Sequence, residues 1–510
     1  MSFNFATILR ESRLTAPDAP CLILDGKALS YADIDEASSC FARGLRTHGL
    51  TVGSVLAVSL SNTAEFVIAY FGAMKAGVVV LPMNPLLKAR EVAYQLADSG
   101  ATAILADQES APEILRSDPV PNSAPVFVTD DSTGTIPTGT RPYRDLLVAD
   151  TGGAERPASD IEPVRATDIA VLLYTSGTTG SPKGAPLSHF QLYMNCTSSA
   201  EVVGVRRDDV ALAALPMFHV FGLSGVLNVA VRVGAALSIM RRFDPGEALA
   251  QLERDRVSIM LGVPTMYFAL LAADASGRDL SRLRMAGSGG ASMPAEILTE
   301  FEKRFGVTLI EGYGLSETAS SATINLPTDR RFGSVGKPIW GVELRIVDDV
   351  DRPLPAGPAN VGEIVLAGHA VIDGYYRRPQ ATAAAFTNGW FHTGDLGYRD
   401  ADGFVFIVDR KKDLVIRGGY NVYPREVEEV LYTHPAIAEA AVIGIADERL
   451  GEEVHAVVAL TAGTSTSPDD IIDYCKQRLA AYKYPRTVSI VDELPKGPTG
   501  KIVKRELRSR

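Results

Sequence analysis

The sequence predicts an α/β protein: a large N-terminal domain followed by a small C-terminal α+β domain. Helix-like and strand-like segments alternate through residues 54–310, and short strand-like runs separated by turns replace them after residue 333. The chain has 510 residues, too many for one hydrophobic core, because domains of about 150 residues are typical. We therefore expect two parallel-sheet α/β lobes, a small β-barrel-like piece and a separate terminal unit.

The first complete unit spans residues 54–82. It is a predicted strand, SVLAVSL, then a helix that begins near Asn62 and ends near Gly77, then the strand VVVLP. The region from Phe66 to Met83 is apolar enough to raise the question of a membrane span. Lys75 interrupts that region, so we expect a helix and a buried strand instead, and no transmembrane segment.

Later segments repeat this alternation and predict parallel strands covered by helices. They lie around residues 91–106, 169–200, 247–263 and 278–310. The stretch from Asp130 to Thr167 is rich in Thr, Pro, Gly, Asp and Ala, which predicts a surface excursion between the lobes.

The pattern changes in the last third of the chain. The runs VELRIVDD, GEIVLAG and GFVFIVDR predict antiparallel strands. Beyond them, PREVEEVLYTH and SPDDIIDYCKQRLAAY are helix-like, whereas AEAAVIGI and EEVHAVVAL are strand-like. We expect a large domain over residues 1–410 and a small one over 411–510, with the boundary at DRKKD, Asp409 to Asp413.

Composition excludes several classes of protein. The chain is 46% apolar and 22% charged, which is typical of soluble globular proteins, and its net charge of −11 argues against nucleic acid as a partner. Four scattered cysteines, with no C-x-x-C spacing, indicate reduced thiols rather than a disulfide framework or a zinc site. The N-terminus lacks a basic region followed by an apolar block, so we expect a cytoplasmic protein.

The segment YTSGTTGSPKG, Tyr174 to Gly184, is the most informative part of the sequence. Its glycines allow the backbone to approach an anion, its hydroxyls are donors, and Lys183 adds a positive charge suited to phosphate. It follows the apolar run Ile169 to Leu173 and precedes Ser188, which is expected to cap a helix. The order Pro-Lys-Gly differs from a Walker A loop, and the alternative is a solvated linker.

YTSGTTGSPKG resembles the signature loop of the adenylate-forming (ANL) superfamily, which includes acyl-CoA synthetases, luciferases and the adenylation domains of peptide synthetases. Further segments resemble the motifs of that superfamily in the same order. They are LPMFHVFG from Leu215, GSGGASMP from Gly287, GYGLSET from Gly312, WFHTGDLG from Trp390, VDRKKDLV with Arg410, RGGYNVYPREVE from Arg417 and PKGPTGKI with Lys501.

The resemblance implies ATP, Mg²⁺ and CoA as cofactors and assigns roles to individual residues. It implies catalytic roles for Lys501, Glu317, His219 and Thr318, with Glu317 as the metal ligand. The implied ATP-binding residues are Thr175, Ser176, Gly177, Thr178, Thr179, Gly180, Lys183, Gly289, Gly290, Ala291, Gly312, Tyr313, Gly314, Thr318, Asp395 and Arg410. The implied acyl pocket is His219, Val220, Phe221, Val263, Gly287, Ser288 and Leu315, and the implied hinge and CoA-side residues are Lys412, Gly418, Gly419 and Tyr420.

Some of these residues have a simpler interpretation from their own chemistry. A single histidine between apolar neighbours, such as His219, is more often a packed core residue, and a lysine near a C-terminus is usually solvated. Asp395 and Arg410 are residue types that usually pair on the surface. Only the order of all the motifs along the chain favours the catalytic interpretation.

The function implied is activation of a carboxylic acid by ATP to acyl-AMP, followed by transfer to CoA. An apolar acid, a medium- or long-chain fatty acid, is expected from Val220, Phe221 and Val263. Alternatives are a malonyl- or aryl-CoA synthetase, or an amide-bond synthetase that uses the same adenylate. A dicarboxylic acid would need a buried arginine for its far end, which the sequence does not identify among Arg232, Arg242 and Arg284. We expect a monomer or homodimer whose partners are the acid, ATP and CoA.

Overall fold

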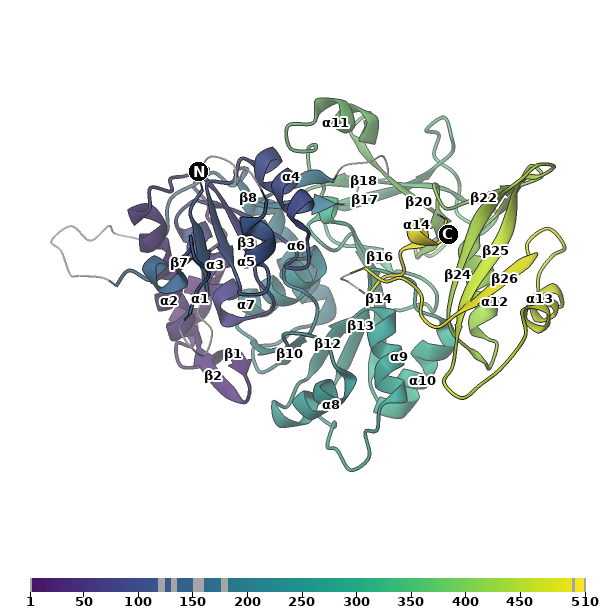
Figure 1. Cartoon of the computed structure of the whole chain (residues 1–510), viewed down its shortest axis with the longest axis horizontal. Helices are drawn as coiled ribbons and strands as arrows, with labels where there is room; N and C mark the ends of the chain where they lie inside the picture. The colour runs from purple at the N-terminus through teal and green to yellow at the C-terminus, as the bar shows by residue number, and fades with distance from the viewer. Residues whose placement is uncertain are drawn as a thin grey trace.

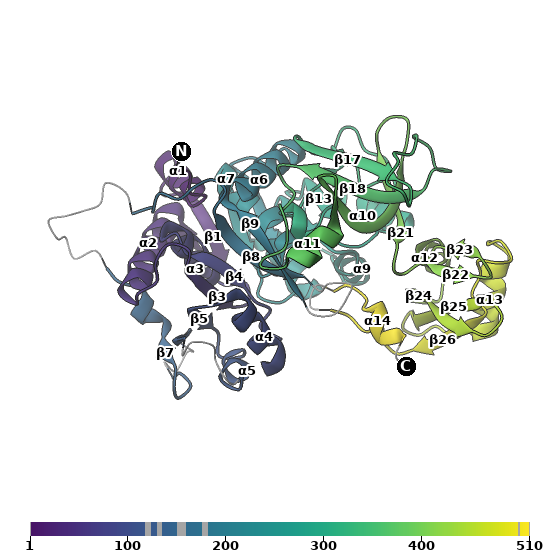
Figure 2. The same cartoon turned by 90° about the horizontal axis from the view of Figure 1, so that it is seen from above.

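A computed structural model of the chain describes residues 2–117, 124–129, 135–149, 160–175, 182–497 and 500–508. Its strands form four sheets. Figure 1 and Figure 2 show two α/β lobes side by side, and a smaller C-terminal domain at one end of the molecule. The α/β class with parallel sheets and a separate terminal domain is confirmed.

The first lobe contains a seven-stranded sheet in which all neighbours are parallel except the β8–β9 pair. In spatial order its strands are β7 (Arg141–Pro142), β6 (Val126–Val128), β5 (Ala103–Ala106), β3 (Val55–Ser59), β4 (Val79–Pro82), β8 (Ile169–Thr175) and β9 (Lys183–Ser188). The N-terminal helices are α1 (Thr7–Thr15), α2 (Tyr31–Thr47), α3 (Ala64–Lys75), α4 (Ala89–Ser99), α5 (Ala111–Leu115) and a 3₁₀ turn (Tyr143–Leu146).

The unit at 54–82 is confirmed as β3, α3 and β4, so the apolar region divides into a helix and a strand as expected. No helix among the described residues is long and apolar enough to cross a bilayer. The expected surface excursion from Asp130 to Thr167 lies partly outside the described residues.

The segment after β8 differs from the predicted strand, loop and helix. Lys183 begins another strand, β9, which pairs antiparallel with β8, and only then does α6 (His189–Val203) begin. Ser188 caps α6 as predicted, because its hydroxyl accepts from the Gln191 backbone N–H. Within β9, Ala185 and Leu187 are fully buried, and this period of two is the strand pattern that the neighbouring glycine and proline obscure in the sequence.

The second lobe contains a nine-stranded sheet with a parallel centre and antiparallel edges. In spatial order its strands are β16 (Lys337–Pro338), β15 (Thr323–Ile324), β14 (Thr308–Tyr313), β13 (Met285–Ser288), β12 (Ile259–Gly262), β10 (Val210–Ala213), β11 (Ala236–Ile239), β1 (Pro20–Leu24) and β2 (Lys27–Ser30). Its helices are α6, a π-helix (Phe221–Asn228), α7 (Val229–Val233), α8 (Pro245–Arg254), α9 (Pro264–Ala272), α10 (Ala295–Phe305) and a 3₁₀ turn (Ser316–Thr318).

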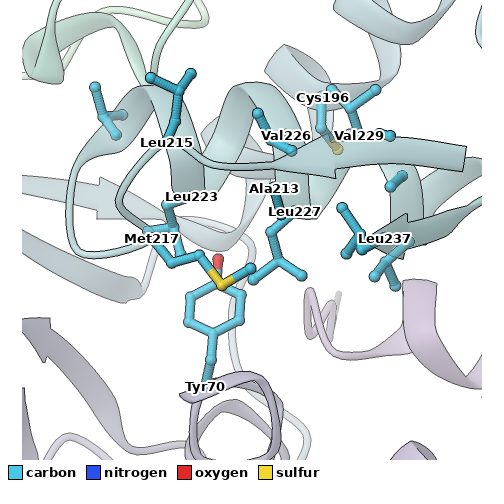
Figure 3. Packing of buried hydrophobic residues seen from close by; sticks show 14 of the residues in the cluster. Tyr70, Cys196, Ala213, Leu215, Met217, Leu223, Val226, Leu227, Val229 and Leu237 are labelled. Atoms are coloured by element: carbon cyan, nitrogen blue, oxygen red, sulfur yellow. The ribbon is translucent and has the colours of Figure 1, made fainter. Parts of the chain in front are cut away.

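One continuous hydrophobic core joins the two lobes. Figure 3 shows Tyr70 of α3 beside Met217, with Leu223 and Leu227 of the π-helix packed nearby. Tyr70 also accepts a hydrogen bond from Asn228 Nδ2 at 3.0 Å. The lobes therefore behave as one body, which fixes the end of β8 relative to the ends of β12, β13 and β14.

An antiparallel sheet follows, as the short strand-like runs predicted. It consists of β17 (Val342–Val347), β18 (Gly362–Gly368), β19 (Phe386–Thr387), β20 (Trp390–Arg399) and β21 (Val405–Arg410), with helix α11 (Pro379–Ala385). The backbone N–H of Val335 donates to Val405 O at 2.9 Å and ties this sheet to the second lobe.

The small domain has its own sheet and core, which confirms the α+β prediction. Its strands are β22 (Val415–Arg417), β23 (Tyr420–Val422), β24 (Ile437–Asp447), β25 (Gly451–Leu460) and β26 (Thr487–Val491), and its helices are α12 (Pro424–Tyr432), α13 (Pro468–Lys476) and α14 (Lys504–Leu507). The expected hinge residue Lys412 lies between β21 and β22. Figure 2 shows the final segment returning from the small domain toward α9 of the large domain.

Candidate active site

The predicted phosphate-binding segment lies between β8 and β9, which pair antiparallel. Thr175, the last residue of β8, is directly opposite Lys183, the first residue of β9. The predicted ATP-binding residues between them, Ser176, Gly177, Thr178, Thr179 and Gly180, lie outside the described residues. The ammonium of Lys183 is 5.1 Å from the centroid of the Tyr375 ring, so a positive charge stands at the base of the loop.

Glu317 lies beside the end of β8, as a site that joins the two motifs requires. Its side chain is buried, and Oε1 accepts hydrogen bonds from Tyr375 Oη at 2.8 Å and from Thr175 Oγ1 at 3.4 Å. Burial, together with the nearby carboxylate, raises the pKa of Tyr375, so this phenol stays protonated and donates. Tyr375 thus contacts both charged residues: its hydroxyl donates to Glu317, and Lys183 lies over the face of its ring.

Glu317 suits a hard cation that is held mainly by a substrate. Among the residues that the structure describes, no group of three or more His, Cys, Asp or Glu side chains is placed to hold a metal. Mg²⁺ is commonly held by one or two carboxylates together with substrate phosphates and water. One buried carboxylate beside a phosphate loop fits that donor set.

Thr318, a predicted catalytic and ATP-binding residue, lies in the 3₁₀ turn that carries Glu317. It is fully buried, and its hydroxyl accepts from the Leu315 N–H at 2.9 Å and donates to Leu315 O at 3.0 Å. The hydroxyl closes the Ser316–Thr318 turn from inside. In this geometry Thr318 shapes the turn that presents Glu317, and its predicted role toward ATP stays a prediction.

Asp395 is the centre of the predicted nucleotide grip. It is 3% exposed and accepts from Tyr313 Oη at 2.6 Å, while Arg410 Nε lies 3.1 Å from its other oxygen. Arg410 stands directly opposite Asp395 where β20 pairs with β21. Two strands and the end of β14 therefore converge on one carboxylate, the group that suits a pair of ribose hydroxyls.

The glycines around Tyr313 are required by close packing. A Cβ on Gly314 would lie 1.5 Å from Ser320 O, and a Cβ on Gly312 would lie 3.2 Å from Thr323 O. These two positions accept no larger side chain without movement of the backbone. The absence of side chains there lets the chain around Tyr313, at the end of β14, pack directly against the backbone of residues 320–323.

Lys501 reaches from the small domain into the large one. A Cβ built on Gly290 would lie 3.0 Å from Lys501 Cε and 3.4 Å from its Nζ, and Gly290 has φ +82°. Burial, and next the charge of Arg410, lower the pKa of Lys501 to about 8. Ala291 follows Gly290 as an exposed residue. The structure thus brings Lys501 to the glycine-rich segment, near Asp395 and Arg410.

His219 stands on the acyl side of Lys501. Burial, and next the positive charge of Lys501, lower the pKa of His219 to about 4. The imidazole is therefore neutral at pH 7, and its Nδ1 accepts from the Phe221 backbone N–H at 3.3 Å. Because the ring is neutral, it can lie beside a carboxylate and leave the Lys501 ammonium as the group that pairs with the negative charge.

An apolar wall continues from His219. The ring of Phe221 lies 3.2 Å from where a Cβ on Gly289 would stand, and 2.9 Å from a Cβ on Gly225. A Cβ on Gly287 would lie 2.5 Å from Leu261 Cδ2. Any side chain at these glycines would collide with the wall, so they keep it narrow and smooth.

The other predicted acyl residues take different positions. Val220 and Val263 are buried, and Val263 Cγ1 lies 3.6 Å from the Cβ position of Gly290. Leu315 is half-buried. Side chains alternate along β13, so Ser288 points to the opposite face of the sheet from Gly287. Ser288 is buried, and its hydroxyl has no hydrogen-bond partner among the described residues.

A dicarboxylic acid would need one buried arginine for its second carboxylate, and the three candidates for that role are engaged elsewhere or exposed. Arg232 donates to Thr197 Oγ1 and Tyr193 Oη, each at 3.1 Å. Arg284 pairs with Asp209 at 2.5 Å, and Arg242 is exposed. None of the three is placed as a free cation at the apolar wall.

The predicted CoA-side residues form a two-residue turn between β22 and β23. Gly418 and Gly419 have φ +56° and +84°, which favours glycine at both positions. Tyr420 is 60% exposed and stacks on Tyr482 with ring centroids 4.9 Å apart. In the hinge, burial and the charge of Arg410 lower the pKa of Lys412.

Residues 9–376 match the family described as AMP-binding enzyme, and residues 426–501 match its C-terminal domain. The chain belongs to this family. It is an AMP-forming acid–thiol ligase of the adenylate-forming superfamily, so the resemblance of the motifs is confirmed.

The AMP-binding enzyme has full-length relatives with different acids in their names. It is 35% identical to the long-chain-fatty-acid–CoA ligase of Bacillus subtilis (strain 168), over 98% of this chain and 93% of that protein. It is also 35% identical to a feruloyl-CoA synthase of an Amycolatopsis species, over 98% of each. These relatives share the ligase class and differ in the acid.

Solved structures agree with this fold over the whole chain. The anthranilate CoA ligase AuaEII in complex with anthranoyl-AMP superposes with a TM-score of 0.91 at 30% identity, covering 100% of this chain and 97% of that one. ATP-bound MatB from Rhodopseudomonas palustris gives 0.90 at 32% identity, covering 100% and 99%.

Several residues of the AMP-binding enzyme site were not identified from its sequence. Tyr375 lies in GYYRRP, a segment without a motif of its own, and its role depends on the long-range contact with Glu317. Leu261 and Gly225 line the wall only because the sheet and π-helix meet there. Tyr482 was also missed, because it lies 62 positions after the predicted Tyr420, on which it stacks.

Proposed function

We propose that the enzyme activates an apolar monocarboxylic acid, a medium- or long-chain fatty acid, as acyl-AMP and passes the acyl group to CoA. The supporting observation is the position of Lys501, between the nucleotide grip at Asp395 and the apolar wall that begins at His219. A cation at that junction faces the two groups that react, the acid carboxylate and the α-phosphate.

In the first half-reaction, a carboxylate oxygen attacks the α-phosphorus of ATP, a new O–P bond forms, and the bond to pyrophosphate breaks. Negative charge develops on the bridging and non-bridging oxygens, so fixed positive charge lowers the barrier. Lys501 supplies it at the α-phosphate and Lys183 at the leaving group. Glu317 would hold Mg²⁺, which adds positive charge to the phosphates when bound. His219, as a neutral ring, orients the acid.

In the second half-reaction, a thiol attacks the acyl carbon and AMP leaves. The small domain would turn near Lys412, which withdraws Lys501 and brings the Gly418–Gly419 turn to the acyl-adenylate. The exposed stack of Tyr420 on Tyr482 gives an aromatic surface beside this turn, of the kind on which a nucleotide base packs.

The lining supports an acid whose body, apart from the reacting carboxylate, carries no charge. Phe221, Leu261 and Val263 are apolar, and Arg232 and Arg284 are already engaged, so a second carboxylate would be buried without a partner. This disfavours malonate, the substrate of one of the alternatives that the sequence left open. The similarity to a fatty-acid ligase supports the fatty-acid proposal.

A second candidate is a flat aromatic acid. The ring of Phe221 packs against the Gly289 and Gly225 positions, which gives a narrow wall that suits a planar ring. The similarity to the feruloyl-CoA synthase supports it equally. The two candidates differ in the length and flexibility of the acid body.

ATP–pyrophosphate exchange over a panel of acids tests the proposal. The panel comprises octanoate, decanoate, palmitate, ferulate, benzoate and malonate, each followed by CoA and measurement of the thioester. The proposal expects the highest kcat/KM for a fatty acid. A preference for ferulate or benzoate would select the second candidate, and exchange with malonate alone would overturn both.

A further inference from the structure

Lys501 lies on a hairpin whose two sides are each tied to the small domain. The backbone N–H of Gly497 donates to Lys501 O at 2.7 Å, and that of Val503 donates to Pro495 O at 2.8 Å. Lys496, on one side, lies 2.7 Å from Glu439. Lys504, on the other side and three residues after Lys501, lies 2.7 Å from Glu428.

The Lys504–Glu428 pair is largely shielded from solvent. The side chains are 21% and 16% exposed, and Glu428 Oε1 also accepts from the Val442 backbone N–H at 2.7 Å. Burial alone lowers the pKa of Lys504, but Glu428 and then Asp409 outweigh it and raise the pKa. The pair therefore joins α14 to both α12 and β24.

The same ammonium faces the hinge segment. Asp409, the next-to-last residue of β21, and Asp413 both act on Lys504 electrostatically. One turn later, Arg508 Nη2 lies 3.0 Å from Asp413 Oδ1. Helix α14 is thus fixed between α12 and the hinge, and the direction in which Lys501 leaves the small domain depends on these contacts.

We propose that Lys504, held by Glu428, is a positioning residue that sets the reach of Lys501 into the adenylation site. The proposal rests on the function proposed above, in which Lys501 acts in the first half-reaction only. A long side chain on a short hairpin transmits any tilt of its base to its tip. A displacement of about 1 Å at a reacting group can reduce a rate by about a hundredfold.

The test compares Lys504→Met, Lys504→Arg and Glu428→Gln with the wild-type enzyme. Lys504→Met should lower kcat of ATP–pyrophosphate exchange at least tenfold and leave the KM for ATP within twofold, because Lys183, Glu317 and Asp395 lie in the large domain. Thioester formation from supplied acyl-AMP should stay within twofold. Lys504→Arg should keep most of the wild-type exchange rate, and Glu428→Gln should lower the exchange rate about threefold.

Glu253→Gln is a matched control. Glu253 on α8 also pairs with a cation, Arg278 at 3.3 Å, and accepts from a backbone N–H, that of Asp279 at 2.9 Å. It should leave both half-reactions unchanged. Thermal unfolding of each variant reports whether the small domain is intact, and if Lys504→Met does not fold, Glu428→Gln carries the same comparison.

Two results would overturn the positioning role: equal loss of both half-reactions, or no loss in either. Failure of the proposed function is a separate result, because wild-type enzyme would then show no exchange with any acid. Lys501→Ala separates the positioning role of Lys504 from the proposed role of Lys501, since it should abolish exchange whereas Lys504→Met should only slow it.

Discussion

The buried ammonium of Lys501 gives adenylation an alkaline limit that a solvated lysine would not impose. Burial, and next the charge of Arg410, lower its pKa from 10.5 to about 8. The protonated form is the one that stabilises the developing negative charge. Activity that depends on Lys501 is therefore present below pH 8 and lost as the pH rises through that value.

The size of the effect follows from the fraction protonated. A group with a pKa near 8 is about half protonated at pH 8 and about one-tenth protonated at pH 9, so kcat/KM should fall about tenfold for each further unit. A lysine with its ordinary pKa would lose only a few per cent by pH 9. Bound ATP is negative and raises the pKa of Lys501, so the limit in kcat should lie at higher pH than that in kcat/KM.

The assay is kcat/KM for ATP–pyrophosphate exchange between pH 6.5 and 9.5 at constant ionic strength. The control is Lys501→Arg, whose guanidinium stays charged over this range and should give a slower but flat profile. Exchange avoids the CoA thiol, which itself ionises in this region. A wild-type profile that is flat to pH 9.5, or the same alkaline limb in Lys501→Arg, would refute the reasoning.

Three further substitutions address other parts of the site. Asp395→Asn should raise the KM for ATP at least tenfold and leave the KM for the acid within twofold, and equal changes in both would contradict a ribose role. Glu317→Gln should lower kcat of exchange about a hundredfold and shift the Mg²⁺ titration to higher concentration; an unshifted titration would exclude it as the metal ligand. Gly289→Ala should raise the KM for bulky acids more than for acetate, because it places a methyl group 3.2 Å from the Phe221 ring. Equal changes in the KM for both kinds of acid would contradict the proposed position of the apolar wall.

The fold could be predicted from the sequence where local pattern decides it. The unit of β3, α3 and β4 has apolar strands bounded by Gly77 and an N-cap at Thr63, and each of these features acts within a few residues. The strands after residue 333 were equally clear, because turn residues separate them. Local propensity and tertiary structure agree in these segments.

Strand β9 shows where local pattern failed. Gly184 and Pro186 interrupt the segment and made it look like a loop, yet Ala185 and Leu187 bury a face against the core. Pairing with β8 determined the structure, and that pairing is a tertiary contact. The bond between the Thr318 hydroxyl and Leu315 is likewise a contact that nothing in GYGLSET indicates.

For the candidate site, the sequence indicated which residue types take part, whereas the topology of the fold determined which of them lie next to each other. Asp395 and Arg410 are 15 positions apart, and they meet because β20 and β21 form an antiparallel pair in that register. Tyr375 and Glu317 meet across 58 positions without any strand pairing between them. A contact of the second kind leaves no period or motif in the sequence.

The arrangement of the two domains bears on the proposal that the small domain turns between the two half-reactions. Lys501 lies against Gly290, and Phe268 of α9 stacks on Tyr432 of α12 with centroids 5.8 Å apart, which is the orientation that the proposed role of Lys501 in adenylation requires. In the same structure Tyr420, next to the Gly418–Gly419 turn, is 60% exposed to solvent. The turn and Lys501 belong to one small domain, in which strands β24 and β25 contribute residues to both hydrophobic clusters. Because a rigid domain cannot place both at the acyl group at once, we infer that thioester formation requires the Phe268–Tyr432 contact to break.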